Sequence, residues 1–219
     1  MTSNIILVVV AHPDDETIGM GATIKKHVNN GDKVHVVSMT DGVSSRDGVE
    51  SKSILDRKKS AKLASEHLGF SWEKNFDFDD NAMDKYPLLE IIKSIELVKK
   101  NIDPDIVYTH SGADLNIDHR VVANAVITVF RPQPNEKCNE IRLFEVASAT
   151  DYGSESILDK FNPNLFINIK DTWDAKELAL IAYETEIREQ PHTRSISGIK
   201  NLAQLRGNQV GLYMSEAFQ

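Results

Sequence analysis

An unbroken apolar run near the start of the chain, Ile5–Val10, leads through one alanine into a histidine, a proline and three consecutive acids. The run has no alternation of apolar and polar residues, which is typical of a strand covered on both faces in a parallel sheet. Pro13 favours an extended conformation for His12, so His12 ends the strand and acids 14–16 enter a helix. Because ligands bind at this edge of open α/β sheets, we expect the functional site here.

Two of these residues form a candidate pair of metal ligands. His12 and Asp15 can converge on one point, while Asp14 projects separately. A neutral imidazole and a carboxylate suit a zinc-like ion, which typically takes three protein ligands in a catalytic site and keeps one position for water. The alternative is a helix N-terminus at which the helix dipole alone favours acids. The histidine before the acids favours the metal site, whose third ligand must come from elsewhere.

The rest of the chain alternates strands and helices. This pattern predicts a Rossmann-like, doubly wound, mostly parallel α/β sheet with helices on both faces. We expect one domain, 1–219, in which the looser part from Asp151 onward packs on the sheet edge and closes the site. A polar loop is expected at 44–50. The further expected strands are 33–39, 72–78, 106–110, 141–147 and 165–169, and the helices after the first are 54–68, 88–98, 118–130, 175–185 and 198–205.

Charge and cysteine content exclude several classes of protein. The formal net charge of -8 argues against a general nucleic-acid binder. Cys138 is the single cysteine, so neither an internal disulfide nor a thiolate zinc cluster can form. No apolar segment approaches about 18 residues and no basic leader precedes the first strand, so we expect no membrane span, no secretion signal and a cytoplasmic location.

The third metal ligand is expected after the fourth strand, where the chain reads THSGADLNIDHR. His119 begins the helix that follows this strand, and it lies beside the first strand's exit if the two strands are neighbours. Asp118 can orient a histidine ligand through a hydrogen bond. The alternative for His119 is a solvent-exposed residue at a helix start.

The motifs AHPDDE and DxNxDH together resemble the LmbE-like, or PIG-L, family of zinc-dependent N-deacetylases. The resemblance extends over nearly the whole chain, including 144–150, 191–195 and 215–218. It implies a Rossmann-like fold and N-acetylated amino sugars as substrates. It assigns His12, Asp15 and His119 as ligands of zinc, with other divalent metals open, and Asp14 as the catalytic base.

Two substrate-binding residues are expected from the same resemblance. Arg57 and Asp80 stand where the family places residues that bind substrate hydroxyls. Arg57 also suits a solvated helix face, and Ser60 stands where the family usually has a glutamate. Asp80 equally suits a helix cap.

This residue set fits amide hydrolysis. A zinc ion lowers the pKa of bound water from 15.7 toward about 7 and polarises the amide carbonyl. Asp14 can accept the proton of that water and return it to the departing amine. The expected products are acetate and a free amino sugar.

The chain departs from the family pattern at Asn116, because many relatives carry HxDH where this chain has NIDH. Asn116 cannot serve as an acid, although its amide can donate a hydrogen bond to an oxyanion. We hypothesise that His192 supplies the missing imidazole, from the same subunit or from a neighbour in a homo-oligomer. His110, at the end of the fourth strand, is the second candidate.

Two other functions fit parts of the pattern. A magnesium or manganese phosphoesterase would use the same acids, but it calls for more carboxylates and fewer histidines. A sugar-binding or regulatory protein without turnover predicts a degraded metal motif, whereas the motif here is intact. The expected partner in the leading interpretation is a small N-acetylated sugar.

Overall fold

The apolar run forms an interior strand of a seven-stranded sheet. The structure, a computed structural model, describes residues 3–46, 51–154 and 157–219, so the expected loop at 44–50 lies partly outside the described residues. The strand order is β3-β2-β1-β4-β5-β7-β6. Strand β1 (Ile5–Val10) pairs in parallel with β2 (Lys33–Thr40) and β4 (Ile106–His110), which explains its continuous apolar sequence.

The expected mostly parallel sheet is confirmed. Strands β1 to β5 run parallel, whereas β7 runs antiparallel to both β5 and β6. The other strands are β3 (Ser71–Phe78), β5 (Glu140–Phe144), β6 (Leu165–Asn168) and β7 (Ser215–Phe218). The helices are α1 (Asp15–Asn29), α2 (Ser51–Leu68), α3 (Leu88–Ile102), α4 (Ile117–Val129), α5 (Trp173–Ala182) and α6 (Ile196–Asn208), with short 3-10 turns at Met83–Lys85 and Lys170–Thr172.

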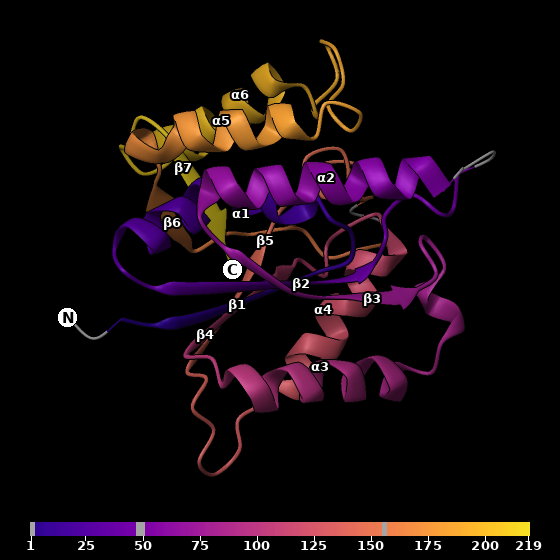
Figure 1. The fold of residues 1–219 in the computed structure, drawn as a ribbon. Helices are drawn as coiled ribbons and strands as arrows, with labels where there is room; N and C mark the ends of the chain where they lie inside the picture. Colours follow the sequence, from indigo (N-terminus) through magenta and orange to yellow (C-terminus); the bar gives the residue numbers. More distant parts are fainter. Residues whose placement is uncertain (1–2, 47–50, 155–156) are drawn as a thin grey trace.

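Helices cover both faces of the sheet (Figure 1). Alternate residues of β1 enter different cores, because successive strand side chains point to opposite faces. Ile6 and Val8 pack in the core formed with α1, α2, α5 and α6, while Leu7 and Val9 pack in the core formed with α3 and α4. This double coverage is the doubly wound arrangement.

A buried ion pair supports a kink in α1. Met20 has non-helical angles, φ -145° and ψ 22°, so helical hydrogen bonds are interrupted there. The Glu216 carboxylate accepts the backbone N–H groups of Ala22 and Thr23 at 3.1 and 2.7 Å. Lys176 Nζ lies 2.6 Å from Glu216 Oε1 and neutralises this carboxylate. The C-terminal segment thereby holds the first helix in place.

Helix α5 is shorter than the sequence predicts. The apolar spacing indicates a helix to residue 185, but α5 ends at Ala182 and the next residues turn toward the carboxyl edge of the sheet. Tyr183 and Glu186 in this turn are both buried. In the part of the chain that the structure describes, every helix is too short or too polar to cross a membrane.

Candidate active site

The site lies where the strand order reverses, at the carboxyl ends of β1 and β4. Chain connections leave these neighbouring strands in opposite directions, which opens a crevice between the loops that follow them. His12 follows β1, and His119 lies in the first turn of α4 after β4. The topology therefore brings together the two motifs that are most unusual in the sequence.

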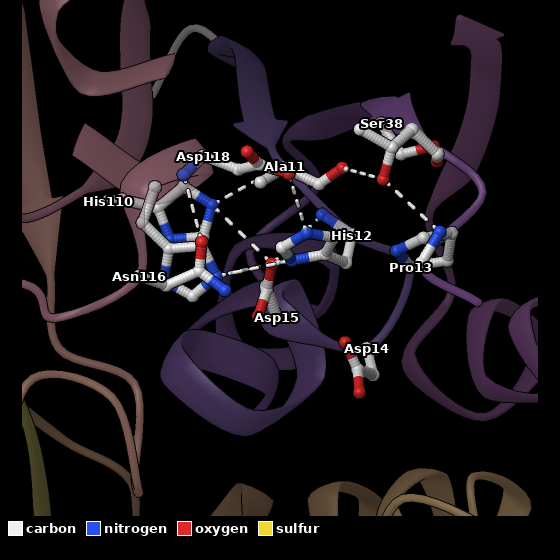
Figure 2. Close-up of polar contacts among 12 residues, drawn as sticks. Ala11, His12, Pro13, Asp14, Asp15, Ser38, His110, Asn116 and Asp118 are labelled. Carbon is white, nitrogen blue, oxygen red and sulfur yellow. Dashed lines mark hydrogen bonds and ion pairs between the residues drawn. The ribbon is translucent and has the colours of Figure 1, made fainter. Parts of the chain in front are cut away.

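His12, Asp15 and His119, the ligand triad, converge on one point. His12 Nδ1 lies 3.2 Å from Asp15 Oδ2 and 3.2 Å from His119 Nε2, and the last two atoms are 3.3 Å apart. A tetrahedral zinc ion with bonds of about 2.0–2.1 Å separates its ligand atoms by roughly 3.3–3.4 Å. The triangle of donor atoms therefore fits zinc. In Figure 2, Asp15 faces the His12 ring while Asp14 lies to one side.

The electrostatics of the ligand triad favour a cation at this point. Burial alone would lower the pKa of His119, but Asp15 and Asp114 raise it to about 9. Burial also opposes the charge on Asp15, yet His119 and His110 hold the pKa of Asp15 well below its ordinary value. A divalent ion competes with protons for the same imidazole and carboxylate atoms.

A second group of acids surrounds the far side of the His12 ring. Asp80 Oδ1 and Asp118 Oδ2 each lie 3.2 Å from His12 Nε2. Both carboxylates are already engaged, since Asp118 accepts the backbone N–H groups of Asn81 and Met83 at 2.7 and 3.0 Å. These acids contact Nε2 of His12, while Nδ1 of the same ring faces Asp15 and His119.

The Asp80 carboxylate, which was expected to bind substrate, is bound by side-chain and backbone groups of the protein itself. Its Oδ2 accepts from Ser45 Oγ at 2.6 Å and from the Ser45 backbone N–H at 3.1 Å. Burial would raise the pKa of Asp80, but hydrogen bonds from His12 and Ser45 lower it to about 2. Asp80 therefore faces His12 as a charged partner, a contact that its expected sugar-binding role did not include.

Asp114 is a site residue that the sequence reasoning passed over. Its Oδ2 lies 3.0 Å from His119 Nδ1, and the same oxygen accepts from Thr150 Oγ1 at 2.9 Å. The other oxygen accepts the backbone N–H of Asn116. Each histidine of the ligand triad thus contacts a carboxylate through its other ring nitrogen. Asp114 is the first Asp of the DxNxDH motif, and this position in the motif could have indicated its role.

Asp14 projects away from the ligand triad into a basic environment. Its Oδ2 lies 3.4 Å from Arg57 Nη1 and 3.7 Å from Arg194 Nη1. Burial raises the pKa of Asp14 above its ordinary value, although both arginines act in the opposite direction. A buried carboxylate with a raised pKa, beside but not within the metal triad, suits a general base.

These side chains line a small open cavity of about 100 Å³. Drug-sized ligands fill pockets of roughly 300–1,000 Å³, so this cavity accommodates the reacting end of a larger molecule. Arg46, Glu186 and Arg194 belong to the lining and were not expected from the sequence. The full lining is His12, Asp14, Asp15, Gly42, Arg46, Arg57, Asp80, Asn81, Asn116, His119, Glu186 and Arg194.

Two expected substrate-binding residues have protein partners. Arg57 donates to the Pro13 carbonyl oxygen at 2.5 Å, and its Nη2 lies 2.5 Å from Glu186 Oε1. Asn116 caps α4 through its side-chain oxygen and donates from Nδ2 to Asn81 Oδ1 at 3.1 Å. Arg57 is thus largely committed, whereas the Asn116 amide has a second N–H and lies at the cavity.

The two candidate proton donors lie outside the cavity lining. His192 accepts the backbone N–H of Arg194 at 3.0 Å and packs edge-on to the Tyr152 ring. His110 is fully buried, its Nε2 accepts the Ala11 N–H at 2.8 Å, and its ring stacks on His119 at 3.9 Å between centroids. His110 therefore contacts His119 of the ligand triad and does not line the cavity. From the loop that contains His192, the side chain that lines the cavity is Arg194.

Comparison with known proteins identifies chains similar to this one in sequence and in fold. The family model described as PIG-L: GlcNAc-PI de-N-acetylase matches residues 7–130, more than half of the chain. The uncharacterized deacetylase YaiS of Escherichia coli (strain K12) is 28% identical over 181 residues, covering 80% of this chain and 88% of YaiS.

Solved structures share the fold at lower identity. An N,N'-diacetylchitobiose deacetylase from Pyrococcus horikoshii superposes with a TM-score of 0.78 at 22% identity, covering 99% of this chain and 83% of that chain. GalB, the 4-carboxy-2-hydroxymuconate hydratase from Pseudomonas putida KT2440, gives a TM-score of 0.77 at 22% identity, covering 99% and 95%. Deacetylases and a hydratase thus use one architecture, so the reaction must be argued from the site.

Proposed function

The chain belongs to the PIG-L family of de-N-acetylases, and we propose that it is a zinc-dependent hydrolase that removes the acetyl group from an N-acetylated amino sugar or sugar conjugate. The observation that carries this proposal is the separation of roles in one cavity. The ligand triad offers three donor atoms 3.2–3.3 Å apart, and the buried Asp14 carboxylate stands beside it.

The residues support a hydrolytic sequence. When bound, zinc supplies a water of lowered pKa and polarises the amide carbonyl. Asp14 accepts a proton from the attacking water as the oxygen–carbon bond forms. Asp14 then returns that proton to the amine nitrogen as the carbon–nitrogen bond breaks, which releases acetate and the free amine. Arg194 and Asn116 line the same cavity, and the Arg194 guanidinium and the second amide N–H of Asn116 can bind the developing oxyanion.

The cavity also supports a substrate whose bulk remains outside. A volume of about 100 Å³ holds an acetamido group better than a complete disaccharide. The relatives point to the same class of substrate, since the Pyrococcus enzyme carries diacetylchitobiose in its name. An N-acetylated amino sugar with its remaining rings or aglycone directed into solvent fits both observations.

An acetate-release panel tests the proposal. The zinc-loaded protein is incubated with N-acetylglucosamine, diacetylchitobiose, N-acetylglucosaminyl conjugates and sugar phosphates, and acetate, free amine and phosphate are measured separately. Equal amounts of both products from at least one compound support deacetylation. Phosphate release from sugar phosphates without acetate would favour the phosphoesterase alternative, and tight sugar binding without either product would favour a binding protein.

A further inference from the structure

The peptide group between Pro13 and Asp14 is held at both ends by hydrogen bonds to the side chains of Arg57 and Glu16. The Pro13 carbonyl oxygen accepts a hydrogen bond from Arg57 Nη1 at 2.5 Å. The Asp14 N–H donates to Glu16 Oε2 at 3.0 Å. Because carbonyl and N–H belong to one planar unit, the two contacts together fix the orientation of that plane.

This orientation matters because the Asp14 backbone is strained. Asp14 has φ 145° and ψ -26°, a region with positive φ that residues with a Cβ rarely adopt. Such conformations persist only where the surrounding contacts impose them. On the other side of Cα, the Asp14 carbonyl oxygen accepts the N–H groups of Thr17 and Ile18 at 3.0 and 2.9 Å. Because the groups on both sides of the N–Cα bond are held, φ of Asp14 is set, and with it the direction of the Cα–Cβ bond.

Glu16 and Arg57 are themselves anchored by the segment after α5. Glu16 Oε1 accepts from Tyr183 Oη at 3.0 Å and from Thr17 Oγ1 at 2.7 Å. Arg57 pairs with Glu186. Glu16, Tyr183 and Glu186 are all buried, and the Glu16–Tyr183 contact lies away from the residues that line the cavity.

We propose that Glu16 and Arg57 are positioning residues that clamp the Pro13–Asp14 peptide and aim the Asp14 carboxylate at the reacting water, with Tyr183 and Glu186 as their anchors. This inference rests on the proposed role of Asp14 as general base. It assigns Glu16, the last acid of the HPDDE motif, a role in aiming the base rather than in binding metal or stabilising the helix start.

A double-mutant cycle distinguishes this role from a merely structural one. Glu16→Ala in zinc-loaded protein should lower kcat by about 10-fold to 100-fold, as small misplacements of catalytic groups do, with KM and zinc content nearly unchanged. Glu16→Gln retains an acceptor for the Asp14 N–H and should restore most of kcat. In an Asp14→Asn background Glu16→Ala should have little further effect, because its consequence passes through Asp14.

Glu216→Gln is the matched control, since Glu216 also accepts backbone N–H groups of α1 but does so at the kink. It should lower the melting temperature without lowering kcat. The proposal is overturned by wild-type kcat in Glu16→Ala, by an equal loss in the Asp14→Asn background, or by a matching loss in Glu216→Gln. If Glu16→Ala does not fold, Tyr183→Phe enters the same cycle with the same criteria.

Crystal structures keep this proposal separate from the proposed function. In Glu16→Ala the Pro13–Asp14 peptide should rotate and Asp14 should leave the positive-φ region, whatever substrate the protein uses. An unchanged Asp14 conformation overturns the clamp. Failure of the wild-type protein to release acetate contradicts the proposed function alone.

Discussion

Glu186 Oε1 lies 2.5 Å from Arg57 Nη2, and this buried ion pair joins the segment after α5 to α2 at the edge of the cavity. The second carboxylate oxygen of Glu186 lies 2.7 Å from Arg46 Nη2. One acid therefore holds two of the three arginines that line the cavity.

Replacement of Glu186 by Gln should destabilise the fold substantially. Without the Glu186 charge, the buried Arg57 guanidinium is left with the more distant Asp14 carboxylate, 3.4 Å away, and we expect the free energy of unfolding to fall by about 3 kcal/mol. Urea unfolding at constant zinc concentration measures this change. Asp56→Asn breaks the exposed Asp56–Lys59 pair as a control and should cost no more than about 1 kcal/mol. Similar small losses in both variants would contradict the anchoring role of Glu186.

Arg194 and His192 give contrasting variants on one loop. Arg194→Met removes a charged donor from the cavity lining, and we expect kcat/KM to fall by about 10-fold to 100-fold, as for loss of a hydrogen bond from a charged group. His192→Ala should have a much smaller effect, because His192 contacts Tyr152 and the Arg194 backbone. Steady-state kinetics on both variants at the same zinc content show which of them loses more kcat/KM. A larger loss in His192→Ala would restore the imidazole mechanism.

The local sequence was sufficient to locate the site on the fold. The apolar run before His12 and the alternation of strands and helices determine which strand ends lie together, because parallel strands place their carboxyl ends on one edge. His12, Asp15 and His119 meet there as expected. The family resemblance added Arg57 and Asp80, which also line the cavity.

Glu186 and Arg194 reach the cavity through tertiary contacts that cannot be predicted from the local sequence. Glu186 reaches the cavity because α5 ends three residues earlier than its apolar spacing suggests. Arg194 and His192 share one loop, and only the packing of that loop decides which side chain enters the cavity. Glu16 looked like an ordinary acid in a helical first turn, but its carboxylate contacts Tyr183, 167 positions away.

Zinc should stabilise the folded protein through the ligand triad. An ion that binds only the folded state adds about 2.7 kcal/mol at a concentration 100 times its Kd, so the melting temperature should rise with zinc and fall on chelation. His119→Ala should abolish this dependence. His35→Ala, which removes a histidine that pairs with Glu73, should retain it. Equal zinc dependence in the His119 variant would place the metal elsewhere.

In the proposed mechanism the ligand triad holds the metal while the adjacent Asp14 acts on the water. Zinc stoichiometry and single-turnover acetate release, measured on the same preparations of wild type, Asp14→Asn and Asp15→Ala, separate these two roles. We expect Asp14→Asn to keep its zinc and to lose roughly 10²-fold or more in rate, as for loss of a general base, whereas Asp15→Ala loses zinc and rate together. Loss of zinc from Asp14→Asn with retention in Asp15→Ala would contradict the account.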